Sequence, residues 1–414
     1  MGGRSRGPGA RVPTSEALRV LVVTDAGPRV GLGHLMRTRA VVEALCVLRP
    51  VRATYLGEMG ARASRLVRGW GYTLRRAGRG TRRQALQAAL AQGGGSDVVI
   101  FDAYRRLEEE IRLAAAAAAV VVRFDDKNGE RRGSAAVTLR IGQSQSRPET
   151  ATTGPGPGRR RAGSAAMASR SAALRLAGPR HLCVRPEIVA LRGRGRGRGA
   201  AGAIVVSLGG GAAPGLGQLL RRLRAAVGGR DWVVLATRRA DVGAGSGRGA
   251  RRAAGRPVAG RRGARRAAPR LSGRVRVVSD PRAAAGALAA APAVVCAAGT
   301  TAWEAACLGV PAVLWPRAAN QRPIARALNG RAAIVCRRSA ELPQALARLL
   351  KDRGLARRLS RLGRRMVDGR GARRIAQAIL RELQHSLRRR KGRFQWTGPA
   401  LMARLRRSQG MGSE

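Results

Sequence analysis

Aromatic side chains are scarce in this sequence, where Phe, Trp and Tyr together make up 3% of 414 residues. A hydrophobic core must therefore be built from alanine, valine and leucine. The hydrophobic share is nevertheless 44%, which in a chain of 43.6 kDa is enough for two cores. Two domains are the expectation.

Cysteine is also rare. The five cysteines are widely spaced and include no Cys-x-x-Cys pair: Cys46, Cys183, Cys296, Cys307 and Cys336. Neither a disulfide framework nor a zinc site is predicted, and a reducing cytoplasm fits best.

Long hydrophobic runs are missing. The longest, Leu113–Val122, has about half of the roughly 20 residues that a spanning helix needs. Residues 1–17 are basic and lead into an apolar stretch that is too short for a signal-peptide core. We expect a cytoplasmic protein without a membrane span.

Acidic residues and lysine are few. The sequence has 23 acidic and 81 basic residues, which gives a net charge of +58. Only three of the basic residues are lysine, so the other 78 are arginine. Such a charge is typical of polyanion binders. The joint excess of arginine, alanine and glycine indicates GC-rich coding instead, and the Arg/Gly segments lack aromatic rings on which bases could stack. A nucleic-acid-binding or polyanion-binding protein is the third hypothesis, and no specific nucleic-acid partner is expected.

Short β-branched runs alternate with longer helical patterns, as in βαβ units with a parallel sheet. The predicted strands are Leu18–Thr24, Arg52–Leu56, Asp97–Asp102, Val120–Asp125, Ala203–Leu208, Trp232–Ala236, Arg274–Val278, Ala293–Cys296, Ala312–Trp315 and Ala332–Cys336. Helices are predicted in the first half at His34–Leu48, Ala61–Trp70, Arg82–Gln92 and Leu107–Ala118. The pattern predicts an α/β protein with two Rossmann-like domains in tandem.

Composition divides the chain further, because stretches rich in Arg, Gly, Pro and Ser have no period. The predicted parts are a disordered N-terminus 1–17, an N-terminal domain 18–146, a linker 147–200, a C-terminal domain 201–368 with a disordered insertion 240–268, and a C-terminal helix and tail 369–414.

A glycine turn joins the first strand to the first helix. Gly31 and Gly33 allow a tight turn and close approach of the backbone to a ligand. His34 falls in the first helical turn, where the helix dipole favours a neutral ring that can act as a general base. Asp25 ends the strand, and Arg37 follows one turn later. The alternative is that His34 only packs or caps.

A second candidate site begins after the strand Ala293–Cys296. Thr300 and Thr301 open a helix and suit phosphate oxygens, while Glu304 can accept hydrogen bonds from a ribose. Thr301 and Glu304 also match a capping box, which is the structural alternative. Further on, Asn320 and Gln321 can donate to a sugar or diphosphate, although Asn320 also suits an N-cap.

Gly209 and Gly210 form one more strand-to-helix turn, at the start of the second domain. Turns of this kind point to the carboxyl edge of a parallel sheet, where open α/β sheets bind ligands.

These motifs, in this order, resemble the nucleotide-sugar hydrolases of pseudaminic acid biosynthesis and related spore-coat polysaccharide proteins. Their GT-B architecture is similar in plan to that of MurG-like glycosyltransferases, with two Rossmann-like domains facing across a cleft. The resemblance covers about Arg19–Asp126 and Pro179–Leu350. The matching text is Asp25, Gly31 to His34, Arg37, Asp97 to Asp102, Tyr104, Asp125-Asp126, Arg185 to Glu187, Ser207 to Gly210, Thr300, Thr301, Glu304, Gly309, Pro311, Asn320 and Gln321.

The resemblance implies that the N-terminal domain holds the sugar and the C-terminal domain holds UDP. It implies hydrolysis of a UDP-activated 2,4-diacetamido-trideoxyhexose, with His34 activating water and with no metal or other cofactor. Asp25 is predicted to share the catalytic role, and Asp102 and Tyr104 to bind substrate. The alternative is transfer of the sugar to an acceptor by a GT-B glycosyltransferase. The oligomeric state stays open.

Overall fold

The structure is a computed structural model that describes residues 17–27, 30–76, 81–92, 95–103, 107–125, 137–142, 173–192, 202–209, 215–235 and 273–393. The predicted insertion 240–268, most of the predicted linker 147–200, residues 1–16 and the tail after residue 393 lie outside the described residues.

The first domain is built on a parallel sheet in the order β3-β2-β1-β4-β5-β6-β7. Its strands are β1 Leu18–Thr24, β2 Val51–Leu56, β3 Thr73–Arg75, β4 Val98–Asp102, β5 Val120–Phe124, β6 Leu139–Gly142 and β7 Leu174–Ala177. In the central strand β1, Val20 and Val22 face one helical layer and Leu21 and Val23 face the other. This two-sided burial explains why the strand is a continuous hydrophobic run.

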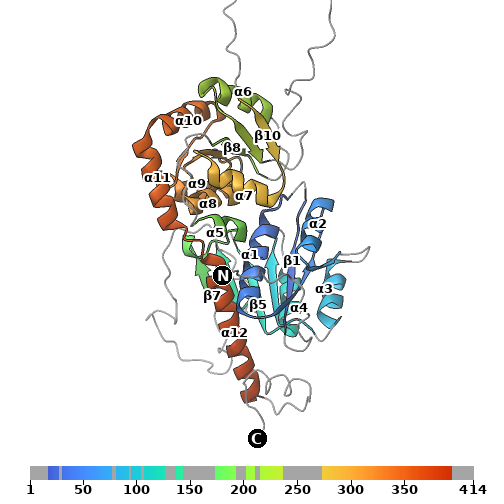
Figure 1. Ribbon diagram of the computed structural model, residues 1–414. Helices are drawn as coiled ribbons and strands as arrows, with labels where there is room; N and C mark the ends of the chain where they lie inside the picture. The colour runs from blue at the N-terminus through green and yellow to red at the C-terminus, as the bar shows by residue number, and fades with distance from the viewer. Residues whose placement is uncertain are drawn as a thin grey trace, which may run out of the picture.

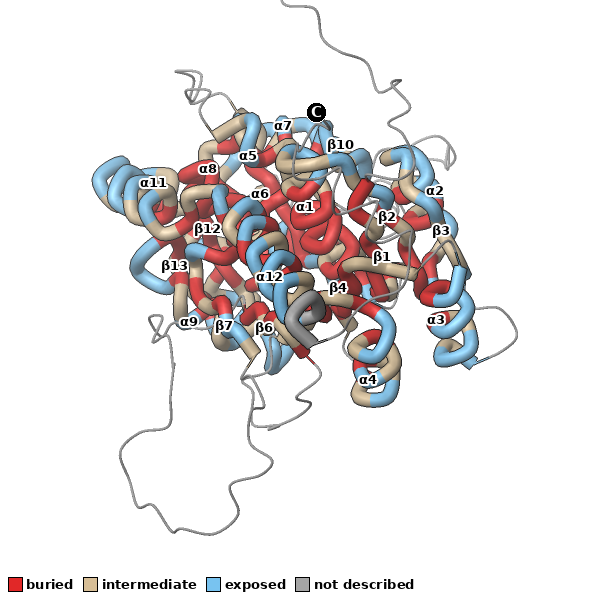
Figure 2. Tube along the Cα trace, turned by 90° about the horizontal axis from the view of Figure 1, so that it is seen from below, coloured by how far each residue is buried: buried red, intermediate tan, exposed pale blue. Residues whose placement is uncertain are grey.

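Helices cover both faces of this sheet. They are α1 Gly33–Leu48, α2 Ala61–Gly69, α3 Arg82–Ala91 and α4 Glu108–Ala117. The helices α1 and α2 share a core with one face, and α3 and α4 share a core with the other. Ten of the 16 residues of α1 are buried, and the helix is red along most of its length in Figure 2. The helix that carries His34 is therefore held on several sides.

The second domain repeats the plan with a parallel sheet in the order β10-β9-β8-β11-β12-β13. Its strands are β8 Ile204–Ser207, β9 Trp232–Leu235, β10 Val275–Val278, β11 Val294–Cys296, β12 Ala312–Leu314 and β13 Ala333–Val335. Its helices are α5 Pro186–Arg192, α6 Leu216–Ala226, α7 Pro281–Ala290, α8 Thr300–Leu308, α9 Arg322–Leu328, α10 Leu342–Lys351 and α11 Arg353–Met366. The 3₁₀ turns η4 Ala319–Gln321 and η5 Ser339–Glu341 lie among them, whereas η2 Pro179–His181 follows β7 and contacts β7 and α12. The prediction of two parallel-sheet α/β domains is confirmed.

The last helix, α12 Gly371–Arg393, crosses from the second domain back to the first (Figure 1). Ile375, Ile379 and Leu383 are buried in the core of the first domain, beside α1. At the crossing a Cβ on Gly371 would lie 2.2 Å from the Leu182 carbonyl oxygen, so the close approach requires glycine. The chain therefore passes between the domains at two adjacent points.

The structure extends the first sheet beyond the range 18–146 predicted for its domain. Strand β7 lies within the range that the sequence assigns to a linker, and α5 follows it in that range and packs in the second domain. Strands β3 and β6 are likewise absent from the sequence-based prediction.

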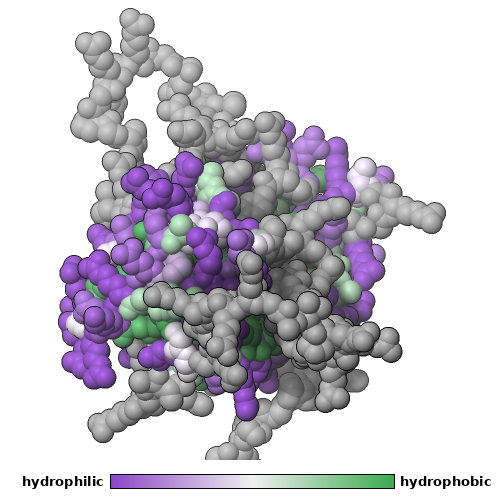
Figure 3. Space-filling model, turned by 90° about the horizontal axis from the view of Figure 1, so that it is seen from above, coloured by the Kyte–Doolittle hydropathy of each residue, from purple (hydrophilic) through white to green (hydrophobic). Residues whose placement is uncertain are grey.

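On the face seen from above, the described residues that are visible are largely hydrophilic (Figure 3). The exposed large hydrophobic residues among the described ones are Val30, Val47, Leu174, Val189 and Val275. Among the described helices, none combines the length and the hydropathy that crossing a bilayer requires.

Candidate functional site

The glycine turn lies where β1 feeds α1. Gly31 has a φ of 82°, a backbone conformation that glycine adopts without strain. The N-cap residue Leu32 provides no side-chain cap, and no acidic residue occupies the first turn of α1. His34 is the second residue of this helix and is 5% exposed.

His34 belongs to a buried cluster with Asp102 and Arg37. The His34 Nδ1 atom lies 2.5 Å from Asp102 Oδ1. Arg37 binds the same carboxylate with two donors, because its Nε contacts Oδ2 and its terminal nitrogen donates to Oδ1 at 2.5 Å. The pairing of β4 with β1 explains why Asp102 lies beside His34 and Arg37, since it places Asp102 opposite Thr24, at the end of the strand that leads into α1. Arg37 and Asp102, predicted to contact substrate, bind each other.

The cluster keeps Asp102 ionised although its side chain is 1% exposed. Burial alone would raise the pKa of this carboxyl group. The charge of Arg37, with the contacts from Arg37 and His34, outweighs burial and holds the pKa of Asp102 below its ordinary value. An ionised carboxylate only accepts hydrogen bonds, so His34 donates to Asp102 through Nδ1.

Asp25 lies at the carboxyl end of β1 as the sequence predicts, and its carboxylate contacts the neighbouring loops. It accepts a hydrogen bond from the Glu58 backbone N–H at 2.9 Å and pairs with Arg82 at 2.9 Å. These contacts tie the turn after β2 to the start of α3. A catalytic role for Asp25 stays a prediction.

The start of α8 carries the threonines of the second candidate site. Its N-cap is Gly299, which makes no side-chain cap, so Thr300 is the first helical residue. The capping box given as the alternative for Thr301 and Glu304 is therefore wrong, because the helix begins two residues earlier than that motif requires. Ser207, at the end of β8, lies 3.4 Å from Thr301 through their hydroxyl oxygens.

Glu304 binds Arg185 instead of a helix cap. Arg185 donates from Nε to Oε1 at 2.5 Å and from its terminal nitrogen to Oε2 at 2.8 Å, and it also donates to the Pro281 carbonyl at 3.1 Å. Arg185 and Glu304 are 9% and 5% exposed, respectively. This buried pair fixes the orientation of the carboxylate and ties α8 to the chain that enters α5.

The two candidate sites meet at the boundary between the domains. A Cβ placed on Gly33 would lie 3.7 Å from the Thr300 Cγ2 atom, in van der Waals contact. The N-termini of α1 and α8 therefore adjoin, although the two residues lie in different domains. Each helix N-terminus carries a partial positive charge, and neither α1 nor α8 has an acidic residue in its first turn. The two adjoining N-termini therefore form an electropositive region that suits an anion.

An ion pair reinforces this boundary. Arg39 of α1 donates to Glu187 of α5 at 2.6 Å and also pairs with Glu43. Its guanidinium lies 4.4 Å from the centre of the Trp70 ring. Burial opposes ionisation of Glu187, but its hydrogen bonds and the charges of Arg39 and Arg185 lower its pKa.

The remaining predicted residues fall in three groups. Gly209 follows β8 with a φ of 106°, which suits glycine. Asn320 and Gln321 lie in the turn η4, whose N-cap is Ala318, and the Gln321 side chain accepts from the Arg317 backbone N–H at 2.8 Å, just before that turn. Asn320 is thus not the predicted N-cap. Tyr104 and Gly210 lie outside the described residues.

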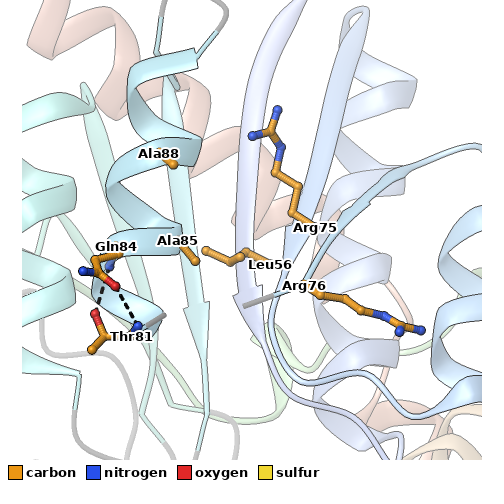
Figure 4. A pocket seen from close by; sticks show the side chains of 7 residues that line it. All are labelled: Leu56, Arg75, Arg76, Thr81, Gln84, Ala85 and Ala88. Carbon is orange, nitrogen blue, oxygen red and sulfur yellow. Dashed lines mark hydrogen bonds between the residues drawn. The ribbon is translucent and has the colours of Figure 1, made fainter. Parts of the chain in front are cut away.

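An open pocket of about 460 Å³ lies apart from these residues, between β3 and α3. In Figure 4 Thr81 and Gln84 bind each other at the start of α3, and Arg76 points away from them. The pocket therefore adds no convergent polar group to the site. Within the described ranges, no three His, Cys, Asp or Glu side chains gather closely enough to hold a metal ion.

Sequence reasoning gave no role to Arg39, Arg185 and Glu187. Arg185 and Glu187 belong to the motif Arg185-Pro186-Glu187, which is one of the motifs that carry the family resemblance. That resemblance was the one sequence feature that could have pointed to them. Their partners lie 119 and 148 residues away, so local spacing could not identify the pairs.

Comparison with known proteins decides the architecture. No protein-family model and no curated protein sequence matches the chain. Among solved structures, MurG of Acinetobacter baumannii is 14% identical with a TM-score of 0.55, over 88% of this chain and 99% of that chain. The chain has the GT-B fold.

Two other similar structures agree with this GT-B assignment. The glycosyltransferase VinC, in complex with dTDP, is 15% identical with a TM-score of 0.52, over 89% of this chain and all of that chain. A UDP-N-acetylglucosamine 2-epimerase is 11% identical with a TM-score of 0.51, over 89% of this chain and 98% of that chain. In this chain the His34 cluster lies in the first domain and the start of α8 lies in the second.

Proposed function

We propose that this chain is a GT-B enzyme that uses a UDP-sugar and transfers the sugar to an acceptor hydroxyl. The observation that carries the proposal is the approach of Gly33 to Thr300, which brings the His34 cluster beside the start of α8. A base and an anion-binding element then adjoin at one domain boundary.

The diphosphate of the substrate would bind at the start of α8. Thr300 and Thr301 offer hydroxyl groups and helix N–H groups there, and Ser207 lies beside Thr301. The N-terminus of α1 adds a second partial positive charge. UDP is the leaving group in this scheme, so charge that develops on its phosphate is stabilised.

His34 would act as the base. As the acceptor oxygen attacks the anomeric carbon, its proton moves to Nε2 of His34, and the electron pair of the broken bond leaves with UDP. Asp102 stabilises the imidazolium ring that forms, because it accepts from Nδ1. The same step with water as the acceptor is hydrolysis.

Hydrolysis is the second candidate. It is supported by the motif from Gly31 to Arg37, which resembles that of the nucleotide-sugar hydrolases. Transfer is favoured by VinC, a glycosyltransferase that has the same fold. The two reactions share the base and the leaving group, so they differ only in the acceptor.

The test is release of UDP from a panel of UDP-sugars, with and without candidate acceptors. Release that requires an acceptor is expected for transfer, whereas equal release without one means hydrolysis. Arg83→Met provides a control, because Arg83 is exposed on α3. Absence of both UDP release and UDP binding in calorimetry would refute the proposal.

A further inference from the structure

The segment Arg185-Pro186-Glu187 contacts a helix of each domain. Arg185 binds both carboxylate oxygens of Glu304 on α8, at 2.5 Å and 2.8 Å. Glu187, two residues later, accepts from Arg39 of α1 at 2.6 Å. One short segment therefore joins the helix that begins at Gly33 to the helix that begins at Thr300.

The backbone between these two side chains is fixed. Pro186 is the first residue of α5, and its ring restricts the rotation about φ. The Arg185 carbonyl accepts from the backbone N–H groups of Ile188 and Val189, at 3.0 Å and 3.1 Å. Ile188 is fully buried in the core of the second domain, where α5 packs against α7 and α8. The segment thus belongs to the second domain, and its carboxylate reaches across to the first.

Both contacts lie just behind the helix N-termini that adjoin at the domain boundary. Arg39 is six residues beyond Gly33, which at 1.5 Å per residue places it about 9 Å along α1. Glu304 is four residues beyond Thr300, which places it about 6 Å along α8. A helix is stiff over such a length, so a displacement of α1 at Arg39 also displaces Gly33 from Thr300.

Arg39 has further partners within the first domain. It pairs with Glu43 one turn later on α1, and its guanidinium lies 4.4 Å from the centre of the Trp70 ring. Its side chain is 8% exposed. Without Glu187 the guanidinium keeps a carboxylate and a ring beside it, so loss of the contact across the boundary leaves no buried cation alone.

We propose that Arg185-Pro186-Glu187 is a rigid spacer that sets the position of α1 relative to α8, and that Glu187 and Arg39 are positioning residues. The inference rests on the proposed function, in which the sugar is transferred where the N-termini of these two helices adjoin. The role of the two residues is to hold the halves of the site at a working distance, not to bind substrate.

Other connections keep the domains joined when this contact is lost. The helix α12 crosses between the domains, and Arg62 of α2 donates to the Ser279 carbonyl oxygen. Removal of the Glu187 contact is therefore expected to loosen the arrangement of α1 and α8 rather than to separate the domains.

A disulfide between Gly33→Cys and Thr300→Cys measures the approach of the two helices without any substrate. A Cβ on Gly33 would lie 3.7 Å from the Thr300 Cγ2 atom, and Gly33 has no positive φ, so a side chain fits there. The rate of disulfide formation with oxidised glutathione reports how often the two thiols meet. Mass spectrometry of the linked peptides distinguishes this product from those of the exposed native Cys46.

Glu187→Met removes the contact across the boundary. The matched control is Glu43→Met, which removes a carboxylate from the same arginine within α1. In the double-cysteine protein Glu187→Met should slow disulfide formation roughly tenfold, because the effective concentration of one thiol at the other falls when the approach is loosened. Glu43→Met should leave the rate nearly unchanged. Arg39→Met added to Glu187→Met should slow it no further, since both changes remove one contact.

Turnover of a UDP-sugar by the protein without added cysteines gives the second readout. Glu187→Met should lower kcat by roughly 10-fold to 10²-fold, because a misplacement of about 1 Å at a reaction centre can cost that much. UDP affinity in calorimetry should be nearly unchanged, because Arg185 and Glu304 still bind each other. Glu43→Met should change neither value. If Glu187→Met does not fold, Glu187→Gln, which removes the charge and keeps the volume, should shift the rate and kcat in the same direction.

Three results would overturn the inference: no disulfide in the parent double-cysteine protein, an equal rate after Glu187→Met, or an equal loss of rate after Glu43→Met. A pair that only stabilises the fold would lower the unfolding free energy in Glu187→Met and leave the disulfide rate and kcat at parent values, which also overturns it. Failure of the proposed function is a separate result, because UDP release would be absent from every variant while the disulfide rates still differed.

Discussion

The buried pair Arg185–Glu304 should be a main support of the second domain. Arg185→Met leaves the Glu304 carboxylate buried without a counter-charge, which costs about 3–5 kcal/mol of unfolding free energy. It also removes the hydrogen bond to the Pro281 carbonyl, worth about 1 kcal/mol. In the double variant Arg185→Met/Glu304→Leu the unpaired charge disappears, so we expect a cost of only about 1–2 kcal/mol.

Denaturant unfolding followed by tryptophan fluorescence measures these differences. Trp303 is buried in α8 next to Glu304 and reports on the affected region. The exposed pair Arg338–Glu341 supplies the control, since Arg338→Met should leave the unfolding free energy nearly unchanged.

The reasoning makes the double variant more stable than the single variant Arg185→Met. If Arg185→Met costs under about 1 kcal/mol, or if the double variant costs as much as the two single changes together, the pair does not support the domain.

Further predictions concern the site and its pH dependence. His34→Ala should lower kcat by roughly 10²-fold to 10⁴-fold and leave UDP affinity, measured by calorimetry, nearly unchanged; equal turnover in both proteins would exclude His34 as the base. Glu304→Gln should weaken UDP binding by about 1–3 kcal/mol and 2′-deoxy-UDP binding by less, if the carboxylate accepts from the ribose; equal losses would leave Glu304 with its structural pair alone. EDTA should not affect turnover, and loss that Mg²⁺ or Mn²⁺ reverses would contradict this. Since the pKa of Asp102 is lowered in the folded state, its stabilising contribution is present above the ordinary value of 3.8 and is lost as pH falls through the lower native value; the stability difference between parent and Asp102→Asn should shrink as pH falls below about pH 4.

The central strands of both sheets were predictable from the sequence, because a strand that is buried on both faces is a continuous run of hydrophobic residues. β1 occupies the predicted residues Leu18–Thr24. The missed strands β3, β6 and β7 have three or four residues each, and each contains arginine. The predicted strands β11, β12 and β13 are as short but consist of uninterrupted hydrophobic residues. In the missed strands arginine interrupts the hydrophobic run, so pairing in the sheet identifies them.

The candidate site was predictable where its chemistry is local. The glycine turn before His34 is readable because a strand-to-helix turn needs small residues. The partner of His34 is Asp102, 68 residues away, and its role depends on the pairing of β1 with β4. For Glu304 the local motif misled, since a distant arginine binds the carboxylate that a capping box would use.

Acidic residues, not basic ones, mark the constrained positions in this chain. With 78 arginines, the presence of an arginine at any one place says little, because composition alone supplies one nearby. The 23 acidic residues are few, and burial of a carboxylate is costly unless a donor is fixed beside it. Asp102, Glu187 and Glu304 are all ion-paired, with side chains at most 14% exposed. All three bind arginines close to the domain boundary, so the arrangement of these carboxylates, rather than the net charge of +58, supports the proposed site.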